Sequence, residues 1–207
     1  MDIEYIKNNF YFEILSSKHD LSNFKCASDD LNDFIKNDAL RQQEMNLNIT
    51  QLAICDGEII GFVSILTDTL KIKTIEDKSL KEEMKNELNV VGEDNTLPAI
   101  KIGRFAIDEK YAQKGLGLFI FRNVLLSILH LSKTKVGLRF ITVEAYAMAF
   151  NFYVKKNNFT YRKSDEKLVK KLESIIQRNP ERQFNLHLDL KDIQLSNEEL
   201  EELRLPV

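Results

Sequence analysis

A short glycine loop holds the residues whose types and spacing best suit chemistry. Residues 110–120 read Lys-Tyr-Ala-Gln-Lys-Gly-Leu-Gly-Leu-Phe-Ile, and they include two of the chain's seven glycines, Gly115 and Gly117. A strand-like apolar run precedes the loop, and an amphipathic run with helical spacing follows it. In such a loop consecutive backbone N–H groups can face one ligand, and the next helix adds its own unpaired N–H groups and positive dipole end. The pattern therefore predicts a site for a phosphate or pyrophosphate.

Two familiar nucleotide motifs do not fit this loop. A P-loop requires Lys followed by Ser or Thr after its second glycine, whereas Gly117 is followed by Leu118 and Phe119. The dinucleotide fingerprint needs a third small residue where this chain has Ile120. That fingerprint also follows the first strand of its domain, whereas this loop follows the fourth predicted strand. Neither a nucleotide triphosphatase nor a dinucleotide-binding enzyme is therefore expected.

The elements that must position the loop alternate between strands and helices. Apolar periodicity and turn residues, such as Ser28 as a helix cap and Asp56-Gly57 between two β-rich runs, define them. Before the loop we expect strands at 11–15, 50–55, 58–65 and 99–107 and helices at 28–36 and 37–45. After the loop we expect helices at 118–129, 147–156, 164–178 and 196–204 and strands at 139–145, 159–162 and 183–190. The order predicts an α/β fold with a mixed sheet.

Composition is that of one soluble globular domain spanning residues 1–207. The chain is 43% hydrophobic and 29% charged, with a formal net charge of −3. We expect an insertion at about 67–97 and a basic helical insertion at about 163–181. Two cysteines and three histidines without ligand spacing predict no metal site. No signal peptide and no apolar run long enough to span a bilayer are apparent, so we expect a cytoplasmic protein without a membrane partner.

The loop and its context resemble the GNAT acetyltransferase superfamily. That family's loop has the form Gln/Arg-x-x-Gly-x-Gly/Ala after the fourth strand, and Gly115 and Gly117 match its glycines. The departure is Ala112 in the first position, with Gln113 one residue late. Residues 152–159, from Phe-Tyr to Asn-Phe, resemble the family's fourth helix, with Asn158 in place of its usual glycine. The resemblance extends over about residues 10–190, and residues 102–108 resemble the family's fourth strand.

The resemblance implies a GNAT-like fold that binds acetyl-CoA as cosubstrate and no metal. The central sheet would be mixed, mostly antiparallel, flanked by helices and splayed between its fourth and fifth strands. The pantetheine arm would pair with the backbone of Phe105, Ala106 and Ile107. The resemblance implies that residues later in the chain also bind the cosubstrate: Ala112, Gln113, Lys114, Gly115, Leu116, Gly117, Leu118, Asn151 and Tyr153. A solvated side chain is the alternative for Lys114, and simple helix exposure is the alternative for Asn151.

The resemblance also implies direct attack of a primary amine on the thioester in a ternary complex. Tyr153 would give a proton to the departing thiolate, and its alternative is a core aromatic ring. Glu144 would accept the amine proton, and its alternative is an exposed or salt-bridged carboxylate. The fourth strand carries Lys101 and Arg104 where many relatives place a carboxylate. A water chain is therefore the alternative to a dedicated base.

The acceptor is less well marked than the cosubstrate. Residues 155–178 contain eight basic and three acidic residues, a net charge of +5 that suits either a solvated helix or a site for an anionic acceptor or RNA. The main hypothesis is a small-molecule or peptide amine, with the enzyme a monomer or homodimer. Residues 24–26 and 31–34 resemble the start of GNAT toxins that acetylate aminoacyl-tRNA, which is the second hypothesis. A non-catalytic acyl-CoA-binding module is the third.

Overall fold

The structure is a computed structural model that describes residues 1–75, 78–87, 95–196 and 199. The chain divides into two compact units. The first unit comprises residues 1–67 and 102–128, and the second comprises residues 68–101 and 129–207. One seven-stranded sheet has the strand order β1-β2-β3-β4-β5-β7-β6. Its strands pair mostly antiparallel, with β4 parallel to β5, so the predicted mixed α/β fold is confirmed.

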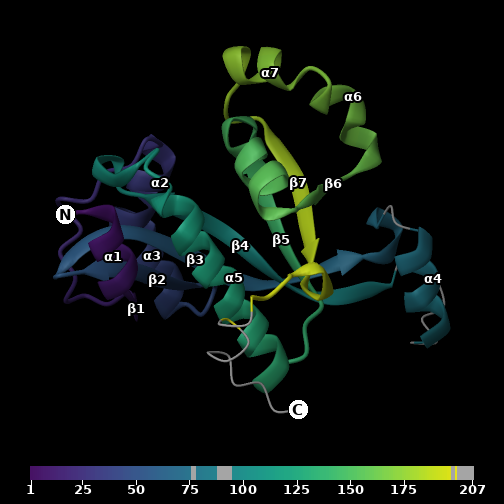
Figure 1. Ribbon diagram of the computed structural model, residues 1–207, viewed down its shortest axis with the longest axis horizontal. Coiled ribbons are helices and arrows are strands. Elements are labelled where there is room, and N and C mark those ends of the chain that lie inside the picture. Colours follow the sequence, from purple (N-terminus) through teal and green to yellow (C-terminus); the bar gives the residue numbers. More distant parts are fainter. Residues whose placement is uncertain (76–77, 88–94, 197–198, 200–207) are drawn as a thin grey trace. The chain divides into compact units, whose positions relative to one another are not determined.

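The first unit contains the N-terminal half of the sheet and the helices on its faces (Figure 1). Its complete elements are α1 (Ile3–Asn9), β1 (Tyr11–Ile14), α2 (Asp29–Asp33), α3 (Ala39–Glu44) and β2 (Ile49–Cys55). It also contains most of β3 (Glu58–Lys71), the end of β4 (Thr96–Ile107) and the first part of α5 (Leu116–Thr134). A π-helical turn at Phe34–Asp38 joins α2 to α3, so the two predicted helices meet without a break. The first helix, α1, was not predicted.

Local sequence signals explain how this unit begins its elements. The Ser28 hydroxyl accepts a hydrogen bond from the N–H of Leu31 at 3.4 Å, which confirms the predicted cap of α2. Asp56 and Gly57 have φ angles of 49° and 77°, the left-handed pair that a tight hairpin between β2 and β3 requires. In α1 the Asp2 carboxylate accepts from the N–H groups of Glu4 and Tyr5.

Side chains of β2 alternate between the two faces of the sheet. Leu52 and Ile54 belong to one apolar cluster, with Phe34 of the α2–α3 segment. Ala53 and Cys55 belong to the other, with residues of α1 and α5. Both cysteines, Cys26 and Cys55, are buried free thiols, which confirms the expectation from the sequence that they are small buried hydrophobes. Burial raises the pKa of each thiol above its ordinary value.

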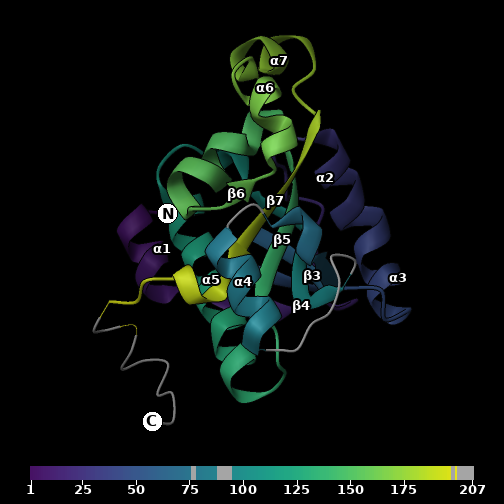
Figure 2. The same ribbon diagram turned by 90° about the vertical axis from the view of Figure 1, so that its right-hand side faces the viewer.

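The second unit contains the rest of the sheet and both insertions (Figures 1 and 2). Its elements are α4 (Lys78–Glu87), β5 (Phe140–Tyr146), β6 (Thr160–Tyr161), α6 (Glu166–Val169), α7 (Leu172–Arg178) and β7 (Gln183–Asp189). The pairing of β5 with β7 is antiparallel, with Phe140 opposite Asp189 and Tyr146 opposite Gln183. A 3₁₀ turn at Ala147–Ala149 and a π-helical turn at Phe152–Lys156 replace the regular helix predicted for 147–156.

The first insertion is built largely from longer strands. The third strand continues to Lys71 and the fourth begins at Thr96, so part of the region 67–97 extends the sheet. The sequence of this insertion also predicts a helix at 79–88, which α4 confirms, and Met84 of this helix is buried in a cluster with Phe140. A turn that the sequence predicts at 92–95 lies mostly outside the described residues. The predicted helix 196–204 also lies outside them, apart from Ser196 and Glu199.

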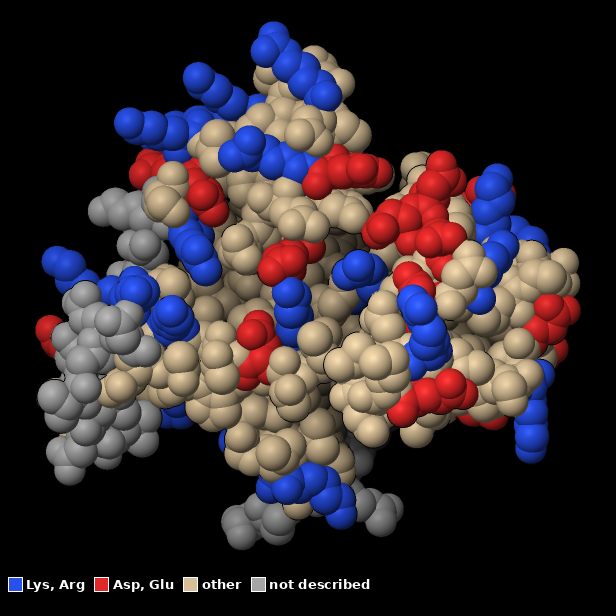
Figure 3. All heavy atoms as spheres, turned by 180° about the vertical axis from the view of Figure 1, so that it is seen from behind, with Lys and Arg blue, Asp and Glu red and all other residues tan. Residues whose placement is uncertain are grey.

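The second insertion differs from the single helix predicted for 164–178. It forms two short helices, α6 and α7, with a turn at Lys170 and Lys171 between them. Lys171 has φ −112° and ψ 17°, outside the helical range, and the next residue, Leu172, is buried. The predicted helix is therefore interrupted next to a residue that is buried in the second unit. Figure 3 shows Lys and Arg side chains gathered on this α6–α7 end of the second unit.

Helix α5 corrects one expectation about membranes. Its 19 residues are long and apolar enough to cross a membrane by length and composition alone, although no such run was expected. Its apolar face is buried inside the protein, with Leu116 and Phe121 fully covered. The apolar spacing that predicted this helix therefore serves as a core face.

The Arg139–Asp189 pair is expected to be a main stabilising contact of the second unit. Both guanidinium bonds to the carboxylate are short, 2.7 and 2.8 Å, and Asp189 is buried. Replacing Asp189 by Ala leaves a largely buried cation, so Asp189→Ala should lower the free energy of unfolding by about 3 kcal/mol. Urea unfolding followed by circular dichroism measures this loss. As a control, Lys191→Ala removes an exposed pair with Glu83 and should cost about 1 kcal/mol or less; an equal loss for both variants would contradict the prediction.

Candidate functional site

The glycine loop leaves the end of β4 and enters α5 through a chain of backbone turns in the first unit. A 3₁₀ turn at Glu109–Tyr111 follows the strand, and Gln113 then adopts a left-handed conformation with φ 60°. Gly115 does the same with φ 81°, and its carbonyl accepts the first helical bond, from the N–H of Phe119 at 3.3 Å. Within the part of the chain that the structure describes, the N–H groups from Gln113 to Leu118 have no acceptor.

The two glycines of the loop serve different purposes. A Cβ on Gly115 would meet nothing within 4 Å, so this position needs glycine for its positive φ and not for space. A Cβ on Gly117 would lie 3.3 Å from Cγ1 of Ile107, at the end of β4. Gly117 therefore lets the first turn of α5 lie close to the strand. The predicted phosphate cradle thus has the free donors and the close approach that its motif requires.

Asp108 holds the start of the loop against a second segment. Its carboxylate, only 1% exposed, accepts from the N–H of Lys25 at 3.1 Å and from the N–H of Lys110 at 2.9 Å. The N–H of Asp108 itself donates to the carbonyl of Ile60 on β3. From the sequence, Asp108 was expected only as the last residue of the segment that resembles the family's fourth strand. That its carboxylate anchors the loop was not predicted. An Asp directly after a strand and before a turn is a capping signal that could have revealed it.

Glu58 ties the loop to β3 through both of its carboxylate oxygens. Lys110 donates to one oxygen at 2.8 Å, and the buried Tyr111 hydroxyl donates to the other at 3.1 Å. Lys110 holds the pKa of Glu58 below its ordinary value, while burial and the carboxylate raise the pKa of Tyr111 to about 12. No sequence signal pointed to Glu58, because the contact joins residues 52 positions apart.

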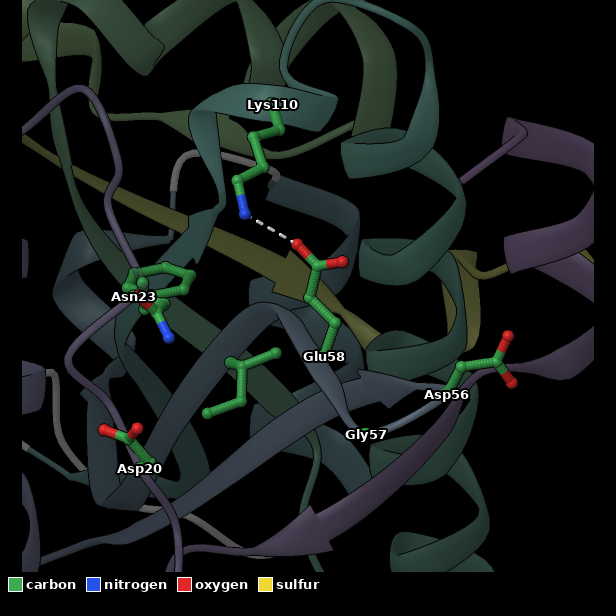
Figure 4. A pocket seen from close by; sticks show the side chains of 8 residues that line it. Asp20, Asn23, Asp56, Gly57, Glu58 and Lys110 are labelled. Carbon is green, nitrogen blue, oxygen red and sulfur yellow. Dashed lines mark hydrogen bonds and ion pairs between the residues drawn. The ribbon is translucent and has the colours of Figure 1, made fainter.

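The same tether forms one wall of a pocket in the first unit. Its volume is about 400 Å³, and it is lined by Asp20, Asn23, Phe24, Asp56, Gly57, Glu58, Ile59 and Lys110. Figure 4 shows Lys110 and Glu58 reaching toward each other across it, while Asp56 points away from them. The Asp56 carboxylate instead accepts from the Tyr5 hydroxyl at 3.3 Å. The carboxylates around this pocket are thus engaged within the protein.

The remaining cosubstrate candidates of the first unit lie on the loop and on β4. Lys114 is exposed, and its ammonium donates to the carbonyl of Lys110 at 2.8 Å, so it folds back on the loop. The Phe105 ring packs against Phe121 at 5.1 Å. Ala106 is buried at the point where β3 comes close, since a Cβ on Gly61 would lie 2.8 Å from its carbonyl oxygen. Binding of a pantetheine arm by this backbone stays a prediction.

Tyr153 lies in the π-helical turn of the second unit and is 6% exposed. Its ring packs edge-on against Phe152 and Phe159, with centroids 5.2 and 5.5 Å away. Burial raises the pKa of its phenol well above the ordinary value. The hydroxyl therefore stays protonated over the whole physiological range, as a proton donor requires. Asn158 stands where the resembling family's helix usually has glycine, so the sequence predicts a left-handed conformation there, and its φ of 58° confirms this.

Glu144 has the salt-bridged environment that was the alternative to a catalytic base. It lies on β5 opposite Asn185 and pairs with Lys101 at 2.8 Å, with 44% of its side chain exposed. The carboxylate is therefore already engaged by an ammonium group. The pair lines a pocket of about 200 Å³ together with Thr142 and Arg162.

Asn151 is exposed at the start of the same helical segment. It lines a third pocket, of about 770 Å³, which the second insertion closes. The structure thus places the loop candidates in the first unit and Tyr153, Glu144 and Asn151 in the second. Among the described residues no group of three or more His, Cys, Asp or Glu side chains could hold a metal ion.

Comparison with solved structures identifies the fold. One match is a Tyr→Phe variant of KacT, 18% identical, covering 88% of this chain and 96% of that one with a TM-score of 0.67. A second is AtaT complexed with acetyl-methionyl-tRNAfMet, with the same identity, coverage and TM-score. A third is AtaTR bound with AcCoA, 20% identical, covering 89% and 95% with a TM-score of 0.63. No protein-family model matches the sequence, and no curated protein matches it.

Asp108 is expected to hold the loop in place through its buried carboxylate. Asp108→Ala leaves the N–H groups of Lys25 and Lys110 without an acceptor, so it should lower the free energy of unfolding by about 2 kcal/mol. Asp108→Asn keeps one acceptor oxygen and should lose less. Chemical unfolding and amide exchange at the loop measure both effects.

The control is Glu109→Ala, which removes only an exposed ion pair with Lys25. This variant should remain within about 0.5 kcal/mol of the unmodified protein. If Asp108→Ala were no more destabilising than Glu109→Ala, the anchoring role of Asp108 would be wrong.

The likeness over nearly the whole chain, together with the order of elements around the glycine loop, shows that this protein has the GNAT fold.

Proposed function

We propose that this protein transfers an acetyl group from acetyl-CoA to the amino group of an aminoacyl-tRNA. The observation that carries the proposal is the row of N–H groups from Gln113 to Leu118, which have no acceptor among the described residues. They occur on a fold that extends over 88% of the chain in common with AtaT complexed with acetyl-methionyl-tRNAfMet. The tRNA acceptor was the second hypothesis from the sequence, and this likeness favours it over a small-molecule or peptide amine.

The loop would bind the pyrophosphate of acetyl-CoA through its backbone. Gln113 and Gly115 turn the chain so that successive N–H groups are available, and the first turn of α5 adds the positive end of a long helix. Ala112 supplies no side-chain donor, so recognition rests on the main chain. The backbone of β4 from Phe105 to Ile107 would pair with the pantetheine arm, with Asn151 as a further contact. AtaTR bound with AcCoA supports this assignment.

The chemistry would be a direct acyl transfer. The amine nitrogen forms a bond to the thioester carbonyl carbon while the carbon–sulfur bond breaks, and Tyr153 supplies the proton that the departing thiolate takes up. Burial raises the pKa of this phenol, so it is protonated at neutral pH. Because Glu144 is paired with Lys101, we assign the amine proton to water and not to a dedicated carboxylate. Water returns a proton to the Tyr153 phenolate, which restores the phenol after each transfer. Positioning of the two substrates would supply most of the rate enhancement. Because acetyl-CoA and charged tRNA both occur in the cytoplasm, we infer a cytoplasmic location.

A transfer assay with labelled acetyl-CoA tests the acceptor. Methionyl-tRNA and other aminoacyl-tRNAs should take up label, whereas uncharged tRNA, which has no primary amine on its 3′ end, should not. Labelling of polyamines, amino acids or peptides without labelling of any aminoacyl-tRNA would contradict the tRNA acceptor and favour a small-molecule or peptide amine. Tight binding of acetyl-CoA without transfer to any acceptor would instead favour a non-catalytic binding module.

The loop assignment predicts that Gly117→Val weakens acetyl-CoA binding. The branched side chain would meet Ile107 and cover the N–H groups at the start of α5, so affinity should fall at least tenfold, about 1.4 kcal/mol. Calorimetric titration measures the dissociation constant. Gly137→Val is the matched control, since a Cβ there would meet nothing within 4 Å. Equal affinities for both variants would overturn the loop assignment.

The proton-donor assignment predicts that Tyr153→Phe lowers kcat by about 100-fold or more with little change in acetyl-CoA affinity. The substitution removes only the hydroxyl and keeps the ring packed between Phe152 and Phe159. Tyr11→Phe, at a half-exposed tyrosine of β1, is the control and should leave kcat unchanged. An unchanged kcat for Tyr153→Phe would leave Tyr153 as a core residue only.

A further inference from the structure

The second insertion is fixed to the rest of the second unit and closes a large pocket. The N–H of Ala147 donates to the carbonyl of Arg182 at 2.8 Å, and the N–H of Met148 donates to the carbonyl of Pro180 at 3.1 Å. At the other side Leu172 is buried where α7 begins. Between α6, α7 and the helical segment after β5 lies the pocket of about 770 Å³. It is large enough for a nucleotide-sized group.

Lysine side chains line this insertion pocket, and two of the three have no ion-pair partner among the described residues. Lys155, Lys170 and Lys171 line it, with Glu173 as the one carboxylate on its wall. Among the basic side chains that the structure describes between residues 155 and 178, only Lys170 has an ion-pair partner, Glu166 at 2.8 Å. Figure 3 shows Lys and Arg side chains over α6 and α7 together with some Asp and Glu side chains, and residues 155–178 carry a net charge of +5. Such a region attracts phosphate groups.

The wall of the same pocket offers an aromatic surface. Tyr161 is half-buried there, and its ring lies 5.6 Å from that of Phe150 at an angle of 50°. Phe150 is buried and packs against the tyrosine ring. Stacking of a base on such a ring contributes about 1–3 kcal/mol without depending on the base. Ammonium groups beside an aromatic wall are the chemistry of single-stranded nucleic-acid sites, whereas an acidic peptide would need the cations alone.

We propose that the insertion pocket binds a single-stranded segment of the acceptor RNA. Lys155 and Lys171 contact its phosphates, and Tyr161 stacks on one of its bases. The inference rests on the proposed function, because it concerns the same RNA acceptor, but it assigns a separate surface to that RNA. A nucleotide of the cosubstrate has the same chemistry, and the experiment below separates the two sources.

Fluorescence anisotropy of a labelled single-stranded oligoribonucleotide and of methionyl-tRNA tests the pocket over a range of salt concentrations. The double variant Lys155→Ala/Lys171→Ala should bind RNA more weakly, and the slope of log K against log salt should fall in magnitude by about 1.4 for two lost phosphate contacts. Tyr161→Ala should weaken binding by about 5- to 100-fold and leave the slope unchanged. Lys133→Ala/Lys135→Ala removes two exposed lysines of the same unit and is the charge-matched control, expected to match the unmodified protein.

Calorimetry with acetyl-CoA completes the design, after circular dichroism has shown that the variants are folded. All variants of the pocket should retain the acetyl-CoA affinity of the unmodified protein. If Lys155→Ala/Lys171→Ala weakens acetyl-CoA binding and not RNA binding, the pocket serves the cosubstrate and the inference is overturned. Unchanged RNA affinity in the pocket variants of a protein that acetylates methionyl-tRNA overturns the inference and leaves the proposed function intact. RNA binding is measured without turnover, so it tests the pocket alone. If the unmodified protein acetylates no aminoacyl-tRNA, the proposed function is wrong, whatever the binding data show.

Discussion

The buried carboxylate of Asp108 is the contact on which the candidate cosubstrate site depends. The carboxylate accepts hydrogen bonds from the N–H groups of Lys25 and Lys110. These bonds fix where β4 ends and in which direction the chain leaves the strand. Glu58 then holds the next turn through Lys110 and Tyr111. The side chains of Lys110 and Tyr111, at the start of the loop, thus fix it to β3. The N–H groups from Gln113 to Leu118 take no part in this anchoring and have no acceptor among the described residues.

The proposed acyl transfer would need little from the protein beyond position and one proton. Burial keeps the phenol of Tyr153, the proposed proton donor, neutral. The carboxylate that was the candidate base is already engaged by Lys101, so the proposed reaction depends on the amine arriving uncharged. An amine with a pKa near neutrality, such as that of an aminoacyl ester, suits such a site better than an alkylamine, which is fully charged at neutral pH.

Sequence reasoning succeeded where the signal is local. Ser28, Asp56 with Gly57, and Asn158 each act on the backbone within a few residues, and the structure confirms all of them. The same reasoning missed α1, although Asp2 is a capping residue at its start.

Failures occurred where contacts distant in sequence decide the conformation. Glu58 binds residues more than 50 positions away, which no pattern in a single sequence reveals. The predicted helix at 164–178 is broken at Lys171, next to the buried Leu172, so packing outweighs the helical periodicity of the segment. The loop residues were found because their glycines form a motif, whereas the residues that support the loop carry no motif.

The two thiols of the chain decide whether a cysteine can carry the acetyl group as a covalent intermediate. Cys26 and Cys55 are both buried, and burial disfavours the thiolate of each. A thiol that stays protonated and covered is a poor nucleophile toward a thioester. The protein thus offers no cysteine on which an acetyl group could rest between donor and acceptor. This agrees with the proposed direct transfer, in which both substrates would be bound together and product formation would follow sequential rather than ping-pong kinetics.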